Sequence, residues 1–76
     1  MWEIKEKKLY KKFKFVDFTQ AIQFINQIAE LATRVNHHPS ILNIYNVVEI
    51  WLCTHDENNE ITAKDHELAK MIDEIK

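Results

Sequence analysis

The sequence predicts an α+β fold in which two helices pack on one face of a four-stranded antiparallel sheet. Two observations carry this expectation. Apolar and polar residues alternate with a period of two near the start and in the middle of the chain, as in strands, and apolar residues recur every three or four positions in two other stretches, as in helices. The expected element order is β-β-α-β-β-α. The 76 residues contain no linker or low-complexity segment, so we expect one domain over residues 1–76.

The first two strands are expected over residues 2–7 and 9–16. Leu9, Phe13 and Phe15 share one face of the second strand, and Tyr10, Lys12 and Lys14 share the other. The two strands form a pair that turns near residues 7–8. The chain contains no glycine, so turns that need positive φ are expected to use Asn and Asp.

The first helix is expected over residues 17–36. A broad apolar stripe predicts it, formed by Phe18, Ala21, Ile22, Ile25, Ile28, Ala29, Ala32 and Val35. Phe24 and Leu31 lie off this stripe, so they could face either a subunit interface or the core.

The ends of this helix are marked by particular residues. Asp17 can accept a hydrogen bond from the backbone N–H of Gln20, and the Gln20 side chain can reach back as in a capping box. Pro39 ends the helix, because the residue before a proline is pushed out of the α region. The two histidines before Pro39 are therefore expected in a short turn.

Two further strands are expected over residues 41–45 and 47–54, which are rich in β-branched and aromatic side chains. Residues 58–59, both asparagine, supply a turn. A last helix starts at Thr62 and carries Asp65 in its first turn. Its buried stripe is formed by Leu68, Ala69, Ile72 and Ile75.

Composition limits the classes of function. The net charge of −2 gives no overall attraction for nucleic acid, and no apolar run approaches the ~18 residues that a membrane span needs. No secretory segment is recognisable, and Cys53 is the one cysteine, so disulfides are excluded and a cytoplasmic setting is expected. Because so short a chain buries a small core, association between subunits is expected to add stability.

Three of the four histidines lie at the ends of predicted elements, where their side chains can converge. His37 and His38 follow the first helix, and His55 follows a strand. Imidazole has an unperturbed pKa of about 6.5, so it can exchange protons near neutral pH, and it also binds zinc. The sequence shows no recognised spacing of zinc ligands. Surface histidines, a metal site and acid–base chemistry all remain open at this point.

Other candidates have a structural explanation beside a functional one. A carboxylate in the first turn of a helix, such as Asp65, stabilises the positive end of the helix dipole without any further role. Cys53 is expected in the core and His66 on an exposed helix face. Trp2 must either pack against the domain or line a site, because it is a large aromatic side chain.

The most specific motif combines segments from the second half of the chain. These are Asn36-His37-His38-Pro39, Asn43-Ile44-Tyr45-Asn46, Leu52-Cys53-Thr54-His55, and Asp65 with Leu68-Ala69. Together with upstream residues such as Trp2 and Phe13-Lys14-Phe15, they resemble the pterin-4a-carbinolamine dehydratase family. The resemblance covers essentially the whole chain, in a short form without the N-terminal helix of longer members.

This resemblance implies a hydro-lyase without metal or cofactor, which dehydrates 4a-hydroxytetrahydropterin to quinonoid dihydropterin and so helps recycle the cofactor of aromatic amino acid hydroxylases. It also implies a homodimer or homotetramer, with a pterin substrate and with no nucleic acid or membrane as partner. The implied catalytic residues are His37, His38 and His55. The implied substrate-binding residues are Trp2, Pro39 and Asp65.

The chemistry explains why histidines would serve. Loss of water from C4a requires a proton for the departing hydroxyl and removal of the proton on ring N5. Imidazoles can do both, and each positioned acid or base contributes about 10²–10⁴-fold. We hypothesise that His37 is the principal acid/base, that His55 is its partner, and that His38 binds or orients the pterin.

One position departs from the family pattern. Thr33 stands four residues before His37, where an acidic residue is usual. A carboxylate at that place would orient an imidazole. The alternative function is therefore a non-catalytic oligomerisation or protein-binding module, because one fold can carry different functions.

Overall fold

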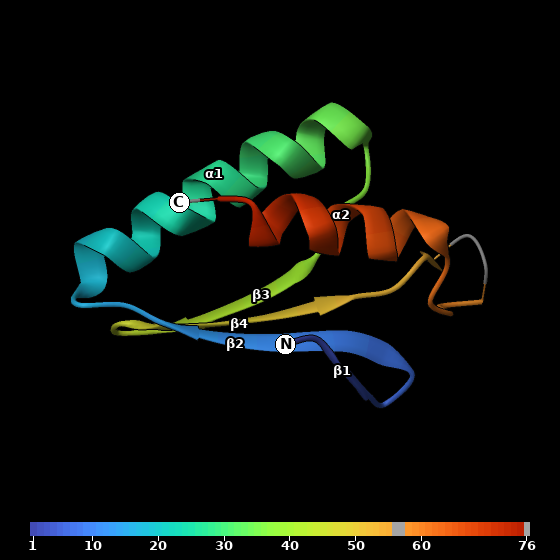
Figure 1. Cartoon of the computed structure of the whole chain (residues 1–76), viewed down its shortest axis with the longest axis horizontal. Helices are drawn as coiled ribbons and strands as arrows, with labels where there is room; N and C mark the ends of the chain where they lie inside the picture. Colours follow the sequence, from blue (N-terminus) through green and yellow to red (C-terminus); the bar gives the residue numbers. More distant parts are fainter. Residues whose placement is uncertain (56–57, 76) are drawn as a thin grey trace.

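The computed structural model describes residues 1–55 and 58–75, which form the elements in the expected order. The strands are β1 (Glu3–Lys5), β2 (Lys8–Lys14), β3 (Ser40–Ile44) and β4 (Val47–Leu52). The helices are α1 (Phe18–Val35) and α2 (Ala63–Asp73). Figure 1 shows both helices on the same side of the sheet. No helix in the described part of the chain is long and apolar enough to cross a membrane.

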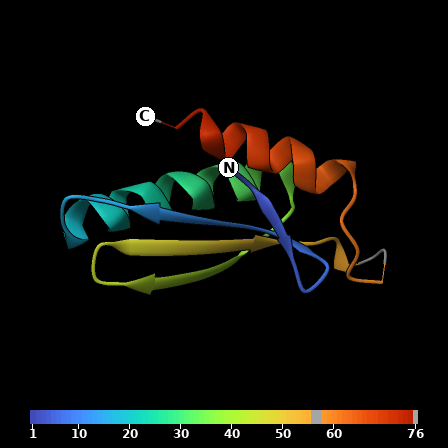
Figure 2. The same ribbon diagram turned by 60° about the horizontal axis from the view of Figure 1, so that its bottom comes forward.

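The sheet has the strand order β1-β2-β4-β3, and all neighbouring strands are antiparallel. The central pair, β2 and β4, places Tyr10 opposite Trp51 and Phe13 opposite Val48. In Figure 2 the helices again lie on one face only. The predicted α+β fold, a four-stranded antiparallel sheet with two helices on one face, is confirmed.

The core lies between the sheet and the two helices. Its buried residues are Leu9, Val48, Ile50 and Leu52 from the sheet, Ala21, Phe24 and Ile28 from α1, and Leu68, Ala69 and Ile72 from α2. Phe24, which the helical stripe left out, is therefore a core residue. Phe18 and Val35, which the stripe included, are 50% and 41% exposed because they lie at the ends of α1.

Asp17 and Asn36 cap the two ends of α1. The Asp17 side chain accepts from the backbone N–H of Gln20 at 2.9 Å, as expected. The Gln20 side chain reaches further back than a capping box predicts, since its Oε1 accepts from the N–H of Val16 at 3.3 Å. At the other end, Asn36 has a left-handed backbone (φ 53°), and the N–H of His37 donates to a carbonyl of the last turn. This turn ends α1 directly before the two histidines.

Non-glycine residues make all of the described positive-φ turns. Three of them are the asparagines Asn36, Asn58 and Asn59, and the others are Glu6, Lys7 and Tyr45. The expectation that Asn and Asp would take these positions is thus correct for half of them and wrong for the rest. Glu6 and Lys7 (φ 51° and 66°) connect β1 to β2. A two-residue hairpin turn matches the twist of its strands when both central residues have positive φ, which explains the strained backbone.

A capping box formed by Thr62 and Asp65 starts α2. Thr62 is the N-cap residue, and its backbone N–H donates to Oδ2 of Asp65 at 2.8 Å. The Asp65 side chain is nevertheless fully buried, with an exposed fraction of 0%. A cap alone does not require this, because the first turn of a helix usually faces water. The burial indicates a further contact.

Candidate active site

His37 lies in the four-residue connection between α1 and β3, residues 36–39. The left-handed backbone of Asn36 ends the helix, Pro39 prevents its continuation, and β3 begins at Ser40. The His37 side chain is 11% exposed. Its ring is therefore held by the protein and is still open to a small molecule.

The contact that holds His37 comes from the far side of the sequence. Nε2 of His37 and Oδ1 of Asp65 are 2.6 Å apart. A carboxylate only accepts hydrogen bonds, so Nε2 carries the hydrogen that it donates. The contact fixes the orientation and the tautomer of the ring. Nδ1 is left as the nitrogen of His37 that can exchange a proton with a substrate.

The second oxygen of Asp65 is also bonded. Oδ2 accepts from the hydroxyl of Thr54 and from the backbone N–H of Thr62, both at 2.8 Å. The two threonine hydroxyl oxygens are 2.6 Å apart, and since Thr54 gives its hydrogen to Asp65, Thr62 donates to Thr54. These donors make the burial of a carboxylate tolerable, because an isolated buried charge is very costly. The groups bonded to Asp65 come from three places along the chain: His37 just after α1, Thr54 just after β4, and Thr62 at the N-cap of α2.

His55 follows Thr54 just beyond the end of β4 and is exposed. Its Nδ1 lies 2.6 Å from Oδ1 of Asn59. The amide oxygen accepts, so Nδ1 carries the hydrogen, and among the described residues Nε2 has no hydrogen-bond partner. The backbone N–H of Thr54 donates to the carbonyl of Glu60 at 2.8 Å. This bond joins the chain segments on either side of His55 and Asn59.

Four of the six predicted site residues line one hollow of about 310 Å³, which we call the histidine hollow. Its lining residues are Asn36, His37, His38, Pro39, Ser40 and His55. Its volume is close to the ~300 Å³ at the lower end of small-molecule sites. His37 also borders a neighbouring hollow of about 280 Å³ on α2. The structure thus brings together the three histidines and the proline that the sequence singled out.

The other two predicted residues are placed differently. Asp65 does not line the histidine hollow and is buried behind His37. Trp2 donates from Nε1 to Oδ2 of Asp73 at 3.0 Å, and its ring packs edge-on against Phe13 with a centroid distance of 6.2 Å. Trp2 therefore packs against β2 and the end of α2 and does not line the histidine hollow, so its contact with a pterin stays a prediction.

Three residues of this arrangement had no expected role. Thr54 and Thr62 hold Asp65, and Asn59 orients His55. Signals for two of them exist in the sequence, because Thr62 and Asp65 have capping-box spacing and Thr54 directly precedes His55. The contacts themselves depend on how α2 packs, and local patterns do not give that packing.

Thr33 does not leave His37 without a carboxylate. Thr33 lies on an exposed part of α1, whereas the carboxylate of Asp65 reaches His37 from α2. His37 thus has a carboxylate as hydrogen-bond partner although position 33 is a threonine.

The arrangement presents two imidazoles that each have one nitrogen fixed by a hydrogen bond and one nitrogen free. Such a pair can supply a proton at one atom of a substrate and remove a proton at another. Within the described residues, no three His, Cys, Asp or Glu side chains gather as a metal ligand set would require.

Comparisons with known proteins agree on one family. The family described as pterin 4 alpha carbinolamine dehydratase matches residues 1–75. A Prochlorococcus marinus protein provisionally named pterin-4-alpha-carbinolamine dehydratase is 48% identical over 75 residues, which cover 99% of this chain and 77% of that protein. A Sulfurisphaera tokodaii protein with the same provisional name is 43% identical over 74 residues, covering 97% of this chain and 78% of that protein.

Two solved structures share the fold. A transcriptional coactivator/pterin dehydratase from Brucella melitensis matches with a TM-score of 0.89 and 35% identity, over 95% of this chain and 78% of that one. A pterin dehydratase-like protein described as a RuBisCO assembly factor of the alpha-carboxysome matches with a TM-score of 0.76 and 23% identity, over 96% of this chain and 83% of that one. The second likeness supports the fold alone. The chain belongs to the pterin-4a-carbinolamine dehydratase family.

Proposed function

We propose that this protein is a hydro-lyase that dehydrates a 4a-hydroxytetrahydropterin to the quinonoid dihydropterin, a step in the recycling of a pterin cofactor. One observation carries the proposal. The ring of His37 is fixed by a fully buried carboxylate, Asp65, at the edge of a hollow that it shares with two further histidines. A surface histidine would not need such a partner.

The reaction asks for two proton transfers and no redox partner. A base removes the proton from ring N5, and the electron pair of that N–H bond forms the C4a=N5 double bond. The bond between C4a and the hydroxyl oxygen breaks, and an acid gives the departing hydroxyl a proton, so that one water leaves. The free nitrogens of His37 and His55 are suited to these two transfers.

The roles follow from the hydrogen bonds. His37 acts as the principal acid/base through Nδ1, because its other nitrogen is held by Asp65. When Nδ1 takes a proton, the buried carboxylate stabilises the imidazolium that forms. His55 is the partner through Nε2, and His38, which is exposed in the same hollow, binds or orients the pterin ring.

The test is a direct assay of dehydration. The 4a-carbinolamine is generated in situ, and its decay is followed by absorbance with and without the protein. The wild-type protein should accelerate decay over the spontaneous rate, and His37→Ala should lower that acceleration by about 10²–10⁴-fold, the usual contribution of a positioned acid or base. His66→Ala is the matched control, since His66 is exposed on α2 outside the histidine hollow, and it should keep full activity.

Two results would contradict this proposal. A folded wild-type protein without acceleration would favour a non-catalytic binding module on the same fold. Full activity of folded His37→Ala would remove His37 from the acid/base role while leaving the dehydratase assignment in place.

Partner binding is the second candidate function. The edge strand β3 and the turn after it expose Leu42, Ile44 and Tyr45, which are 42%, 63% and 64% exposed. An edge strand with apolar side chains is a ready site for strand pairing. We propose that copies of this chain pair along β3 to form a homodimer, from which a homotetramer could be built.

A cytoplasmic location stays a prediction from the sequence.

A further inference from the structure

A larger hollow lies at the opposite end of the helix pair from the histidines. Its volume is about 460 Å³, which is well within the ~300–1,000 Å³ of small-molecule sites. In both ribbon views the N-terminal half of α1 extends past the C-terminal end of α2 (Figures 1 and 2). We call this hollow the aromatic pocket, and its lining includes Phe13, Phe15, Phe24, Gln20 and Gln27.

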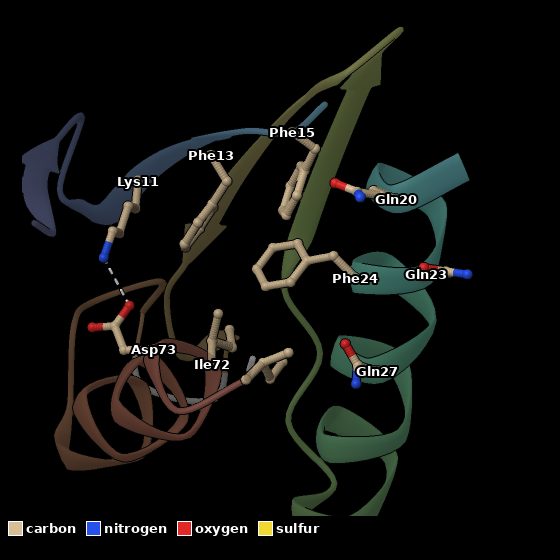
Figure 3. A pocket seen from close by; sticks show the side chains of 10 residues that line it. Lys11, Phe13, Phe15, Gln20, Gln23, Phe24, Gln27, Ile72 and Asp73 are labelled. Carbon is tan, nitrogen blue, oxygen red and sulfur yellow. Dashed lines mark hydrogen bonds and ion pairs between the residues drawn. The ribbon is translucent and has the colours of Figure 1, made fainter. Parts of the chain in front are cut away.

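Three phenylalanines form the apolar part of the aromatic pocket. Phe13 and Phe15 come from β2 and its end, and both face Phe24 of α1 (Figure 3). The ring centroids of Phe13 and Phe24 are 4.7 Å apart, and those of Phe15 and Phe24 are 4.9 Å apart. Phe24 is buried, whereas Phe13 and Phe15 keep part of their surface exposed. Such rings offer flat faces on which another planar ring can pack.

Glutamines form one polar side of the pocket. Figure 3 shows the amides of Gln20 and Gln27 on either side of Phe24, and Gln23, which lies between them in the sequence, also lines the pocket. Steps of three and four residues place the three glutamines on one face of α1. An amide offers both hydrogen-bond donors and an acceptor.

An ion pair forms the opposite side. Nζ of Lys11 and Oδ1 of Asp73 are 2.8 Å apart, and Oδ2 of Asp73 accepts from Nε1 of Trp2 at 3.0 Å. The two charges compensate each other, so this side offers polarity without an excess of either sign. A charged ligand would have to compete with this pair, and an uncharged one would not.

From these features we propose that the aromatic pocket binds a small, uncharged, planar nitrogen heterocycle of one or two fused rings. Its faces pack on the phenylalanine rings, and its polar edge bonds with the amide of Gln27, assisted by that of Gln20. This binding is separate from the histidine hollow and does not depend on the proposed dehydratase activity, since the two hollows share no lining residue.

Hypoxanthine, a fused two-ring lactam, is the probe for this site. It is titrated into ¹⁵N-labelled protein, and the backbone and glutamine side-chain amides are followed by NMR. We expect saturable shifts that include the side-chain amide of Gln27, with a Kd of about 1 mM or below, which corresponds to about −4 kcal/mol. Cyclohexanecarboxamide, which has an amide and no planar ring, should cause no saturable shifts.

Two variants distinguish binding in the aromatic pocket from nonspecific binding elsewhere on the protein. Gln27→Ala should weaken hypoxanthine binding by about three- to tenfold, the effect of one lost hydrogen bond. Asn26→Ala is the matched control, because it removes an exposed side-chain amide from the same helix outside the pocket lining, and it should bind as the wild type does. Equal weakening in both variants, or no saturable shift up to the solubility of hypoxanthine, would overturn the proposal. A third outcome is that hypoxanthine does not bind, while sedimentation shows self-association that Gln27→Ala weakens and the control variant does not. The pocket would then be assigned to contact with a second copy of the chain.

Discussion

The side chain of Asp65 both caps the N-terminus of α2 and holds the ring of His37. Its Oδ2 accepts from the N–H of Thr62 and completes the cap of α2, while its Oδ1 holds Nε2 of His37. Both oxygens are needed as acceptors, because Oδ2 also receives the hydroxyl of Thr54. An asparagine at this place would turn a donor toward one of these partners. The carboxylate is therefore specified by chemistry as well as by shape.

The substitution Asp65→Asn tests this role in orienting His37. We expect kcat for dehydration to fall by about 10- to 100-fold, the range for loss of a carboxylate that orients a histidine. The KM should change little, because Asp65 does not line the histidine hollow. Long-range ¹H–¹⁵N spectra of the His37 ring should show loss of the single tautomer.

The control for that substitution is Asp73→Asn. Asp73 is an exposed carboxylate on the same helix, paired with Lys11, and its removal should leave kcat and the His37 tautomer unchanged. Unchanged kcat in a folded Asp65→Asn protein would show that the hydrogen bond serves the fold only.

Tyr10 gives a second prediction at the scale of single residues. Its phenol donates to Oε1 of Glu49 at 2.5 Å, and this bond, with burial and the nearby negative charges of Glu49 and Glu3, raises the pKa of Tyr10 from 10.0 to about 12. When the pKa of a group is higher in the folded than in the unfolded protein, the group stabilises the fold. This stabilisation is fully present at pH values below the pKa of the unfolded protein. That contribution should be lost as pH rises from about 10 to about 12.

The measurement uses a background with one tyrosine. Tyr45→Phe leaves Tyr10 as the sole phenol of the chain, so its ionisation can be followed by ultraviolet absorbance. Adding Glu49→Gln should move the Tyr10 midpoint down toward 10, because the carboxylate acceptor is gone. If both proteins titrate at the same pH, the Glu49 contact does not set the pKa.

The elements differ in how well local sequence specifies them. The ends of α1 agree with the expectation to within one residue, because Asp17 and Pro39 are explicit start and stop signals. The positive φ of Glu6 and Lys7 carried no such signal, since it is imposed by the pairing of β1 with β2. The contact of His37 with Asp65 arises from the packing of α2 against α1, and for this reason the histidines could be singled out from the motif while the bonding partner of His37 could not.

The hairpin turn between β1 and β2 carries a prediction about stability. Lys7→Gly should raise the free energy of unfolding by about 0.5–1 kcal/mol. Left-handed backbone costs an L-residue about 1–2 kcal/mol, and glycine removes this cost. Part of the gain is offset because glycine loses more chain entropy on folding. Urea unfolding would measure it. Lys8→Gly, one residue later and inside β2, should instead lower stability by a similar amount. A loss of stability in Lys7→Gly would show that the turn is not strained.

At the scale of the whole molecule, the layers leave much apolar surface uncovered. The helices cover one face of the sheet (Figures 1 and 2), and β3 is an edge strand with exposed apolar side chains. A chain of this length buries a modest fraction of its surface, so a second copy along β3 would add core that one copy lacks. We therefore expect assembly along β3 to add to the stability of the fold.

Self-association along β3 can be tested by charge. Ile44→Lys places a lysine on the edge strand, where a charge opposes strand pairing, and should reduce the sedimenting mass of the wild-type assembly to that of one chain. Val16→Lys is the control, because Val16 is also apolar and 78% exposed but lies outside β3. A wild-type protein that sediments as one chain, or Ile44→Lys that assembles like the wild type, would show that β3 is not the interface.

The partners of Asp65 lie just after α1 (His37), just after β4 (Thr54) and at the N-cap of α2 (Thr62), so the His37 ring is held only where these three elements have already docked. No half-formed state of this small chain can hold His37 in its working tautomer. Catalysis then becomes a reporter of cooperative folding: on heating, the midpoint of activity loss should coincide with the midpoint of unfolding seen by circular dichroism. We therefore expect the proposed activity to be lost together with the fold, with no weakened intermediate between the two.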